Sequence, residues 1–180
     1  MRPGGKRRMR GRRWPWVAGG AGGAGVAIAL LVAGQAVAAD DTSTTDRLRQ
    51  AVRADYVLQC AGCHRVDGRG SNPHGIPDFR QSVGAFVHLP AGREYLIRVP
   101  GAAHSQLSNA ELAAVLNWVL TEFSAAQLPA DFAPYTEAEV AVARPRRYDD
   151  VVPVRHDLAD KLSSMGFTLS AYSYGRDRKP

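Results

Sequence analysis

The stretch Cys60-Ala61-Gly62-Cys63-His64 decides the fold and the chemistry of this 180-residue sequence. Two cysteines separated by two residues and followed at once by a histidine form the attachment sequence of a c-type haem. Two thiols three residues apart on one turn can each add to a haem vinyl group, and the next residue then presents its imidazole to the iron. We therefore predict Cys60 and Cys63 as covalent attachment sites, His64 as the proximal iron ligand, and one haem c per chain.

Other chemistries use the same residue types. A thioredoxin-like redox dithiol would need a preceding β-strand in a βαβ unit, whereas the preceding residues have a helical pattern. A zinc site could use both thiolates, His64 and one more histidine. The usual second His-x₃₋₅-His or Cys-x-x-Cys pair is absent from the sequence. A disulfide between Cys60 and Cys63 would close a very short, strained loop. Haem is favoured, and the zinc site and the redox dithiol stay open as alternatives.

The first 38 residues have the pattern of an export signal. Met1–Arg13 holds seven basic residues and no acid, and Trp14–Ala38 is uncharged and ends in Ala36-Val37-Ala38. A basic start, an apolar run and a small-residue cleavage site are typical of a secretory signal peptide. We therefore expect residues 1–38 to be removed and the protein to be periplasmic. The alternative is an uncleaved inner-membrane anchor, because the uncharged run is long enough to span a bilayer.

The net charge of +6 depends on this leader. Without its seven cations, 16 Lys and Arg face 17 Asp and Glu, so the mature chain carries a formal charge near −1. The basic balance is thus a targeting signal, and we expect no nucleic-acid partner.

The sequence predicts that the mature chain forms one small all-α domain, residues 39–130, followed by an extension, residues 131–180. We expect helices over about 46–59, 79–86, 91–98 and 109–123, the first capped by Thr44 or Thr45. Ser108-x-x-Glu111 is a capping box for the last of these helices. In the extension, Thr136-x-x-Glu139 caps a short helix, a second helix covers about 152–164, and the polar end from residue 172 is expected to be disordered. Residues beyond 134 are expected to be dispensable for folding.

From Ala51 to Phe123 the sequence resembles the class I cytochromes c. Tyr56 lies four residues before the first cysteine. Trp118 lies where the family's terminal helix supplies a second aromatic residue. Pro77, in Ile76-Pro77-Asp78-Phe79, matches the proline segment that follows the motif.

This resemblance implies a small bundle of three to four helices wrapped around one covalently attached haem. Tyr56 and Trp118 would meet where the first and last helices cross, at the haem pocket. The carbonyl of Pro77 would accept a hydrogen bond from His64 and fix its orientation.

Two departures from the family pattern concern the helix crossing and the sixth iron ligand. Val52 stands where the family has a small glycine. Between His64 and Phe123 there is no methionine, which is the family's usual distal ligand, and Met165 is the methionine of the mature chain. His104, shortly before the terminal helix, is therefore the candidate sixth ligand. His88 is the alternative, followed by Met165 or an open position.

The resemblance implies an electron carrier and not an enzyme. We expect single electrons to pass between periplasmic redox partners such as a dehydrogenase, an oxidase or another cytochrome. The missing methionine motivates a different class, a haem enzyme or gas-binding sensor with an open sixth position. A third hypothesis is a haem subunit of a membrane-tethered complex, in which case the leader would be retained.

Overall fold

The computed structural model describes residues 24–176, and the side chains of residues 41–176. Over this range the chain forms α-helices and short 3-10 helices without a β-strand, and its extended pairing is a single antiparallel bridge between Ser71 and Ile76. The all-α class expected from the sequence is confirmed. The chain divides into two units between Ser43 and Thr44, and the second unit contains the candidate site.

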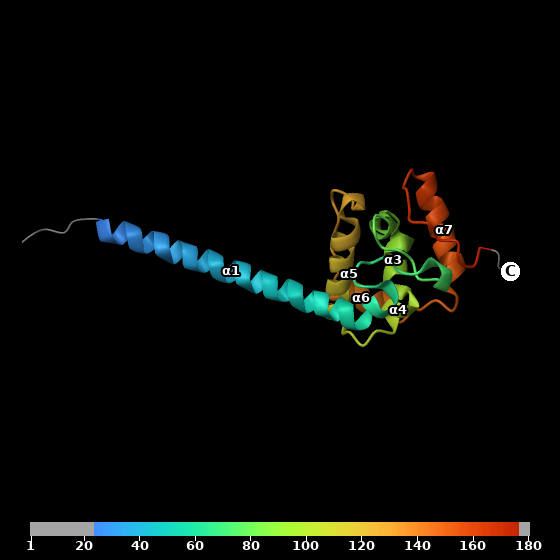
Figure 1. Cartoon of the computed structure of the whole chain (residues 1–180), viewed down its shortest axis with the longest axis horizontal. Helices are drawn as coiled ribbons and strands as arrows, with labels where there is room; N and C mark the ends of the chain where they lie inside the picture. Colours follow the sequence, from blue (N-terminus) through green and yellow to red (C-terminus); the bar gives the residue numbers. More distant parts are fainter. Residues whose placement is uncertain (1–23, 177–180) are drawn as a thin grey trace, which may run out of the picture. The chain divides into compact units, whose positions relative to one another are not determined.

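The described helices are shown in Figure 1 and follow in this order: α1 (Ala24–Gln59), α2 (Ala61–His64), η1 (Asn72–His74), η2 (Val83–His88), α3 (Pro90–Arg98), α4 (Pro100–Ala103), α5 (Asn109–Ser124), η3 (Ala125–Gln127), α6 (Glu137–Ala143) and α7 (Val151–Ser164).

Helix α1 begins earlier than the sequence predicted. It is continuous from Ala24, so the prediction that Thr44 or Thr45 caps a helix starting near residue 46 is wrong. The reason is cooperativity: no glycine or proline interrupts residues 40–45, and extending an existing helix requires no new nucleation. Residues 1–23 of the predicted leader lie outside the described residues. Within the described range, no helix is both long and apolar enough to cross a membrane.

Helix α5 supplies one wall of the core, and its N-terminus follows the prediction. The Ser108 hydroxyl accepts a hydrogen bond from the Glu111 backbone N–H, and the Glu111 carboxylate accepts one from the Ser108 N–H, which completes the capping box. One face of the helix is buried, and it comprises Leu112, Ala113, Val115, Val119, Leu120 and Ser124. Burial of this apolar stripe is the main term that holds the helix in place.

The predicted helical segment at 79–86 is instead a 3-10 helix, η2, which runs from Val83 to His88. Gly84 explains why it lies so close to α5. A Cβ at this position would meet the backbone oxygen and the side chain of Ser124, and the Gly84 N–H donates to the Ser124 hydroxyl at 3.0 Å. The end of α5 and the start of η2 are thereby joined.

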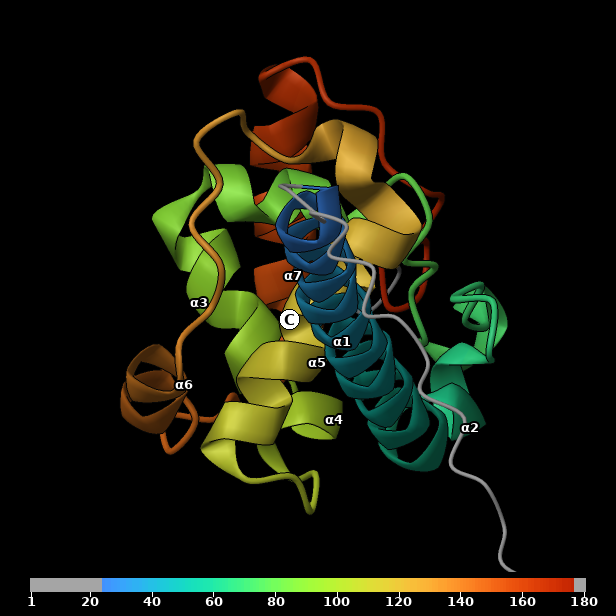
Figure 2. The ribbon, with the colours of Figure 1, turned by 90° about the vertical axis from the view of Figure 1, so that its left-hand side faces the viewer.

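The C-terminal extension is packed into the same core. Helix α6 contacts α5 and α3, and α7 contacts η2 and α3 (Figures 1 and 2). Val140 and Leu162 are completely buried, and Leu158 is 3% exposed. Tyr172, where the sequence predicted disorder to begin, donates a hydrogen bond to the Gly75 carbonyl. This packing argues against the expectation that residues beyond 134 are dispensable.

Candidate functional site

The Cys-x-x-Cys-His motif forms a single turn directly after α1. Cys60 is the residue before α2, and the backbone N–H of His64 donates to the Cys60 carbonyl at 3.0 Å, so both thiols and the imidazole project from one short turn. Cys60 is half-buried and Cys63 is exposed, and both are free thiols. The turn ends at Arg65, whose φ of 62° lies in the left-handed region.

Tyr56 anchors this turn to the core. Its side chain is completely buried, and its hydroxyl donates to the Arg65 carbonyl at 2.6 Å. Its ring centroid lies 4.9 Å from that of Trp118 and 5.6 Å from that of Phe123, both in α5. Tyr56 in α1 therefore contacts Trp118 in α5, as the resemblance to the class I cytochromes c predicts for the first and terminal helices.

His64 is oriented by a carbonyl group. Its Nδ1 lies 3.2 Å from the carbonyl oxygen of Pro77. Because a carbonyl only accepts, Nδ1 must carry the hydrogen, and Nε2 keeps its lone pair for a metal ion. The Phe79 ring stacks on the imidazole with centroids 3.9 Å apart. Burial lowers the pKa of His64 to about 4, the Pro77 carbonyl opposes that change, and the positive charge of Arg155 adds to it.

Gly70 allows the Pro77 segment to approach the motif. Its φ is +62°, and a Cβ there would overlap the carbonyl oxygens of Ile76 and Pro77. Its N–H also donates to the His64 carbonyl at 3.0 Å. Glycine is thus required here for both conformation and space.

The Cys60 thiol does not have the lowered pKa of a redox dithiol. Burial, with a smaller effect of the neighbouring Cys63, raises the pKa of Cys60 to about 11. A reactive Cys-x-x-Cys pair depends on a lowered thiol pKa. Within residues 41–176, no group of three or more His, Cys, Asp or Glu side chains is placed to hold a metal ion, so the zinc interpretation gains no further ligand from these residues.

The two candidate sixth ligands have different surroundings. His88 is half-buried: its Nε2 lies 2.8 Å from the Gln127 carbonyl and its ring centroid 4.5 Å from that of Phe167. That nitrogen must carry the hydrogen, so it is not available to iron in this arrangement. His104 is exposed, immediately after α4. In the described part of the chain, neither residue forms a hydrogen bond or ring contact with His64.

The residues that sequence reasoning missed lie mostly in the extension. The Ser173 N–H donates to the Asn72 side chain at 3.1 Å, and the Tyr172 hydroxyl to the Gly75 carbonyl at 3.2 Å. Both partners lie in the loop between His64 and Pro77, so the C-terminal segment holds the loop that orients His64. No local pattern indicates these contacts, because the partners are about a hundred residues apart.

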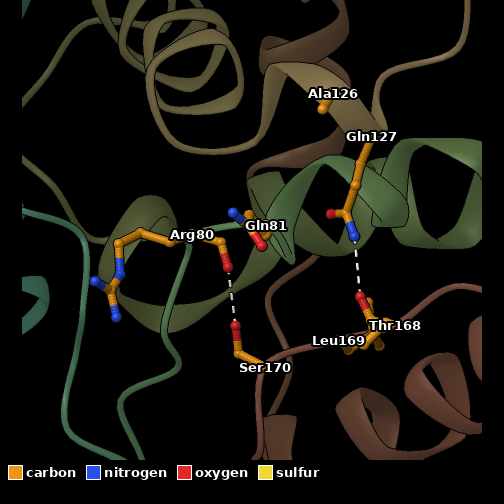
Figure 3. Close-up of a pocket in the computed structure, with 7 residues that line it drawn as sticks. All are labelled: Arg80, Gln81, Ala126, Gln127, Thr168, Leu169 and Ser170. Atoms are coloured by element: carbon orange, nitrogen blue, oxygen red, sulfur yellow. Dashed lines mark hydrogen bonds between the residues drawn. The ribbon is translucent and has the colours of Figure 1, made fainter.

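A cavity of about 320 Å³ lies where the same segment meets η3 and the residues just before η2 (Figure 3). Across it the Ser170 hydroxyl donates to the Arg80 carbonyl at 2.9 Å, and the Gln127 side chain donates to the Thr168 carbonyl at 3.0 Å. Its lining includes neither cysteine nor His64, so this hollow belongs to the packing of the extension and not to the motif.

The helical fold, the oriented histidine and the two free thiols on one turn together define the c-type cytochrome class. A cytochrome c-552 of Thermus thermophilus is 33% identical over 118 residues, which are 56% of this chain and 79% of that protein. A second Thermus thermophilus cytochrome c-552 is 33% identical over 116 residues, 54% of this chain and 88% of that protein. The chain belongs to the c-type cytochrome family.

Other comparisons gave no match. No protein-family model matches the sequence. No solved structure matches it either.

Family membership implies haem c as the cofactor, and the residues present fit it. Cys60 and Cys63 are unpaired thiols on one turn, and the His64 tautomer leaves Nε2 available. In addition, Arg155 is a buried cation whose Nε has no hydrogen-bond partner, as expected where an anionic group of a cofactor belongs.

Proposed function

We propose that this protein is a class I, monohaem c-type cytochrome that carries single electrons between redox proteins in the periplasm. The observation that carries the proposal is the geometry of His64, which is fixed by the Pro77 carbonyl beside two unpaired thiols. In its bound state the haem supplies an iron that gains or loses one electron. The protein's part is to hold, orient and insulate that group.

Attachment is proposed to occur through Cys60 and Cys63. Each thiol would form a thioether by adding across one of the cofactor's two vinyl double bonds, with its hydrogen retained in the product. No atom is lost and no oxidant is required. The high pKa of Cys60 indicates that this thiol is protonated at neutral pH before attachment.

His64 is proposed as the proximal ligand, through Nε2. Its hydrogen bond to Pro77 fixes the tautomer and ring orientation, as outer-shell partners of metal-bound histidines generally do. Tyr56 and Phe79 exclude water from this side of the motif, because Tyr56 is fully buried and Phe79 covers one face of the imidazole. A dry, rigid surrounding lowers the reorganisation that accompanies electron transfer.

The sixth ligand is proposed to be His104. The Arg144 guanidinium donates to the carbonyls of Ala103, Ser105 and Leu107, so the backbone on both sides of His104 is fixed. The alternative ligand, His88, would first have to leave its bond to Gln127. The comparisons do not favour an open-site haem enzyme or sensor, or a subunit of a membrane-tethered complex.

The proposed organisation is a leader at 1–38, a cytochrome domain at 39–130 and an extension at 131–180. Export with cleavage after the Ala36-Val37-Ala38 signal places the mature protein in the periplasm. Amino-terminal sequencing of the purified protein tests this: it should begin at Ala39 or Asp40, and an intact Met1 chain in the membrane fraction would establish an anchor instead.

Covalent haem is tested in a host competent for haem c maturation. The wild-type mass should increase by one haem, and the colour should survive acid–acetone extraction. Replacing both cysteines, Cys60→Ser with Cys63→Ser, should abolish both signals. The His64→Ala variant is the matched control, because it keeps the attachment residues while removing the ligand. A colourless wild type would overturn the proposal.

A further inference from the structure

Arg155, in α7, is a buried cation that the proposed electron-carrier function does not yet use. Arg155 is 5% exposed, and its Nε atom is buried without a hydrogen-bond partner. None of the ion pairs formed by residues 41–176 includes Arg155. An unpaired charge in a protein interior is strongly unfavourable, so a buried arginine of this kind requires an anionic partner.

The neighbouring groups do not supply that negative charge. The guanidinium carbon lies 5.1 Å from the ring centroid of Phe86 and 4.5 Å from that of Tyr172. The faces of these rings attract a cation but do not neutralise it. The side chain of Tyr95 is the nearby hydrogen-bonding group, and burial raises the pKa of its hydroxyl, which therefore stays neutral.

The position of Arg155 relative to the motif indicates where the missing anion comes from. Its guanidinium carbon lies 4.5 Å from the ring centroid of Tyr172, whose hydroxyl donates to the Gly75 carbonyl in the loop between His64 and Pro77. A haem attached at Cys60 and Cys63 is held by its vinyl edge. Its two propionate carboxylates would lie at the opposite edge of the ring, away from the two cysteines. The attached group would thus supply carboxylates of the charge that the guanidinium of Arg155 lacks.

We infer that Arg155 binds a haem propionate, with the Tyr95 hydroxyl as a second donor, and that the C-terminal extension therefore completes the cofactor site. This inference rests on the proposed haem attachment at Cys60 and Cys63. Arginine suits the role because its planar fork of N–H groups matches the two oxygens of a carboxylate. The bound cation keeps that propionate ionised in a site that would otherwise favour the neutral acid.

Other titratable groups near this site affect how it must be measured. Tyr95 comes from α3, Tyr172 from the C-terminal segment and His64 from α2. His156, the neighbour of Arg155, packs its ring 5.6 Å from that of Tyr172, and Asp150 acts on Tyr172 through its charge. A pH-dependent potential alone would therefore not identify the propionate, and the carboxyl carbons must be observed directly.

The test uses the holoprotein grown on 5-aminolevulinate labelled with ¹³C at its carboxyl carbon, which labels the haem propionates. Their ¹³C resonances are followed against pH in the ferrous state, together with the midpoint potential. In the wild type one propionate should titrate at lower pH than the other. In Arg155→Met its pKa should rise by about 1 to 3, and the potential should become pH-dependent over the same range.

Lys161→Met is the matched control, because it removes an exposed cation from the same helix. It should leave both carboxyl titrations unchanged. If Arg155→Met does not yield holoprotein, Arg155→Gln, which keeps a donor but no charge, is measured instead. Wild-type propionates that titrate together in the ordinary carboxylic range would overturn the inference without any variant. A wild type that carries no haem would instead show that the proposed function itself is wrong.

Discussion

Nδ1 of His64 lies 3.2 Å from the carbonyl oxygen of Pro77, and the two residues are 13 positions apart. A loop punctuated by glycines joins them, and this loop is held from outside by hydrogen bonds to Tyr172 and Ser173. The orientation of His64 therefore depends on the conformation of the loop and on the C-terminal segment that contacts it.

The first prediction concerns Gly70. In Gly70→Ala, the alanine would have to adopt a left-handed backbone conformation, and its Cβ would overlap the Pro77 carbonyl oxygen. We therefore expect a loss of more than about 1 kcal/mol of folding free energy. The His64 bond should weaken, and the optical spectrum should show mixed iron ligation. Gly101→Ala is the control, because nothing lies within 4 Å of its Cβ position. Equal unfolding midpoints for the two variants would refute this role.

The second prediction concerns the sixth ligand. If His104 binds iron, the ferric wild type should be low-spin without the weak far-red methionine–iron band. Its potential should lie below that of a His/Met cytochrome, since a thioether raises it. His104→Ala should become high-spin and bind carbon monoxide readily, while His88→Ala should not. The reverse pattern would assign His88, and a high-spin wild type would reject both histidines.

The third prediction concerns Arg144, whose charged hydrogen bonds fix the backbone around His104. Arg144→Met leaves the carbonyls of Ala103, Ser105 and Leu107 without these donors, so we expect a loss of about 1.5 to 3 kcal/mol. Denaturant unfolding measures this loss, and carbon monoxide binding reports whether the loop has loosened. The exposed Arg147→Met serves as the control and should change stability by less than about 0.5 kcal/mol.

The fourth prediction concerns the extension. Leu162 is completely buried, so Leu162→Ala should cost about 2 to 5 kcal/mol. Val142→Ala, at a side chain that is 70% exposed, should change stability by less than about 0.5 kcal/mol. A chain ending at Pro134 should lose cooperative thermal unfolding, since it lacks Leu162 and its core neighbours. A truncated protein with unchanged thermal stability would restore the view that the extension is dispensable.

The fifth prediction is a pH dependence at Tyr135. Burial raises the pKa of this hydroxyl above its ordinary value of 10.0. Above pH 10 the unfolded tyrosine loses its proton while the folded one keeps it, so the free energy of unfolding falls as pH rises. The slope from this residue reaches about 1.4 kcal/mol per pH unit. Below pH 10 its contribution is constant.

Tyr135→Phe tests that dependence. The variant should lose about 0.5 to 1.5 kcal/mol at neutral pH, because the hydroxyl donates to the Arg93 carbonyl at 2.9 Å. Its stability should then fall less steeply than that of the wild type between about pH 10 and 11.5. Parallel curves in urea unfolding over this range would contradict the assignment.

The sequence by itself determined the features that depend on neighbouring residues. The Cys60-to-His64 turn, the capping box of Ser108 and Glu111, and the helices at 109–124, 137–143 and 151–164 all follow from patterns within a few residues. Such patterns can be recognised because helical hydrogen bonds and caps join positions three or four apart.

Only the tertiary structure decided which distant groups meet. In the folded chain the Phe79 ring stacks on that of His64, and His88 Nε2 forms a hydrogen bond with the Gln127 carbonyl. Arg155 is buried without an ionic partner. The extension looked dispensable because its apolar pattern is weak in isolation, yet its leucines complete a core that begins about a hundred residues earlier, at Tyr56. A contact of this kind depends on the path of the whole chain, and hydrophobic burial is non-directional, so no local spacing encodes it.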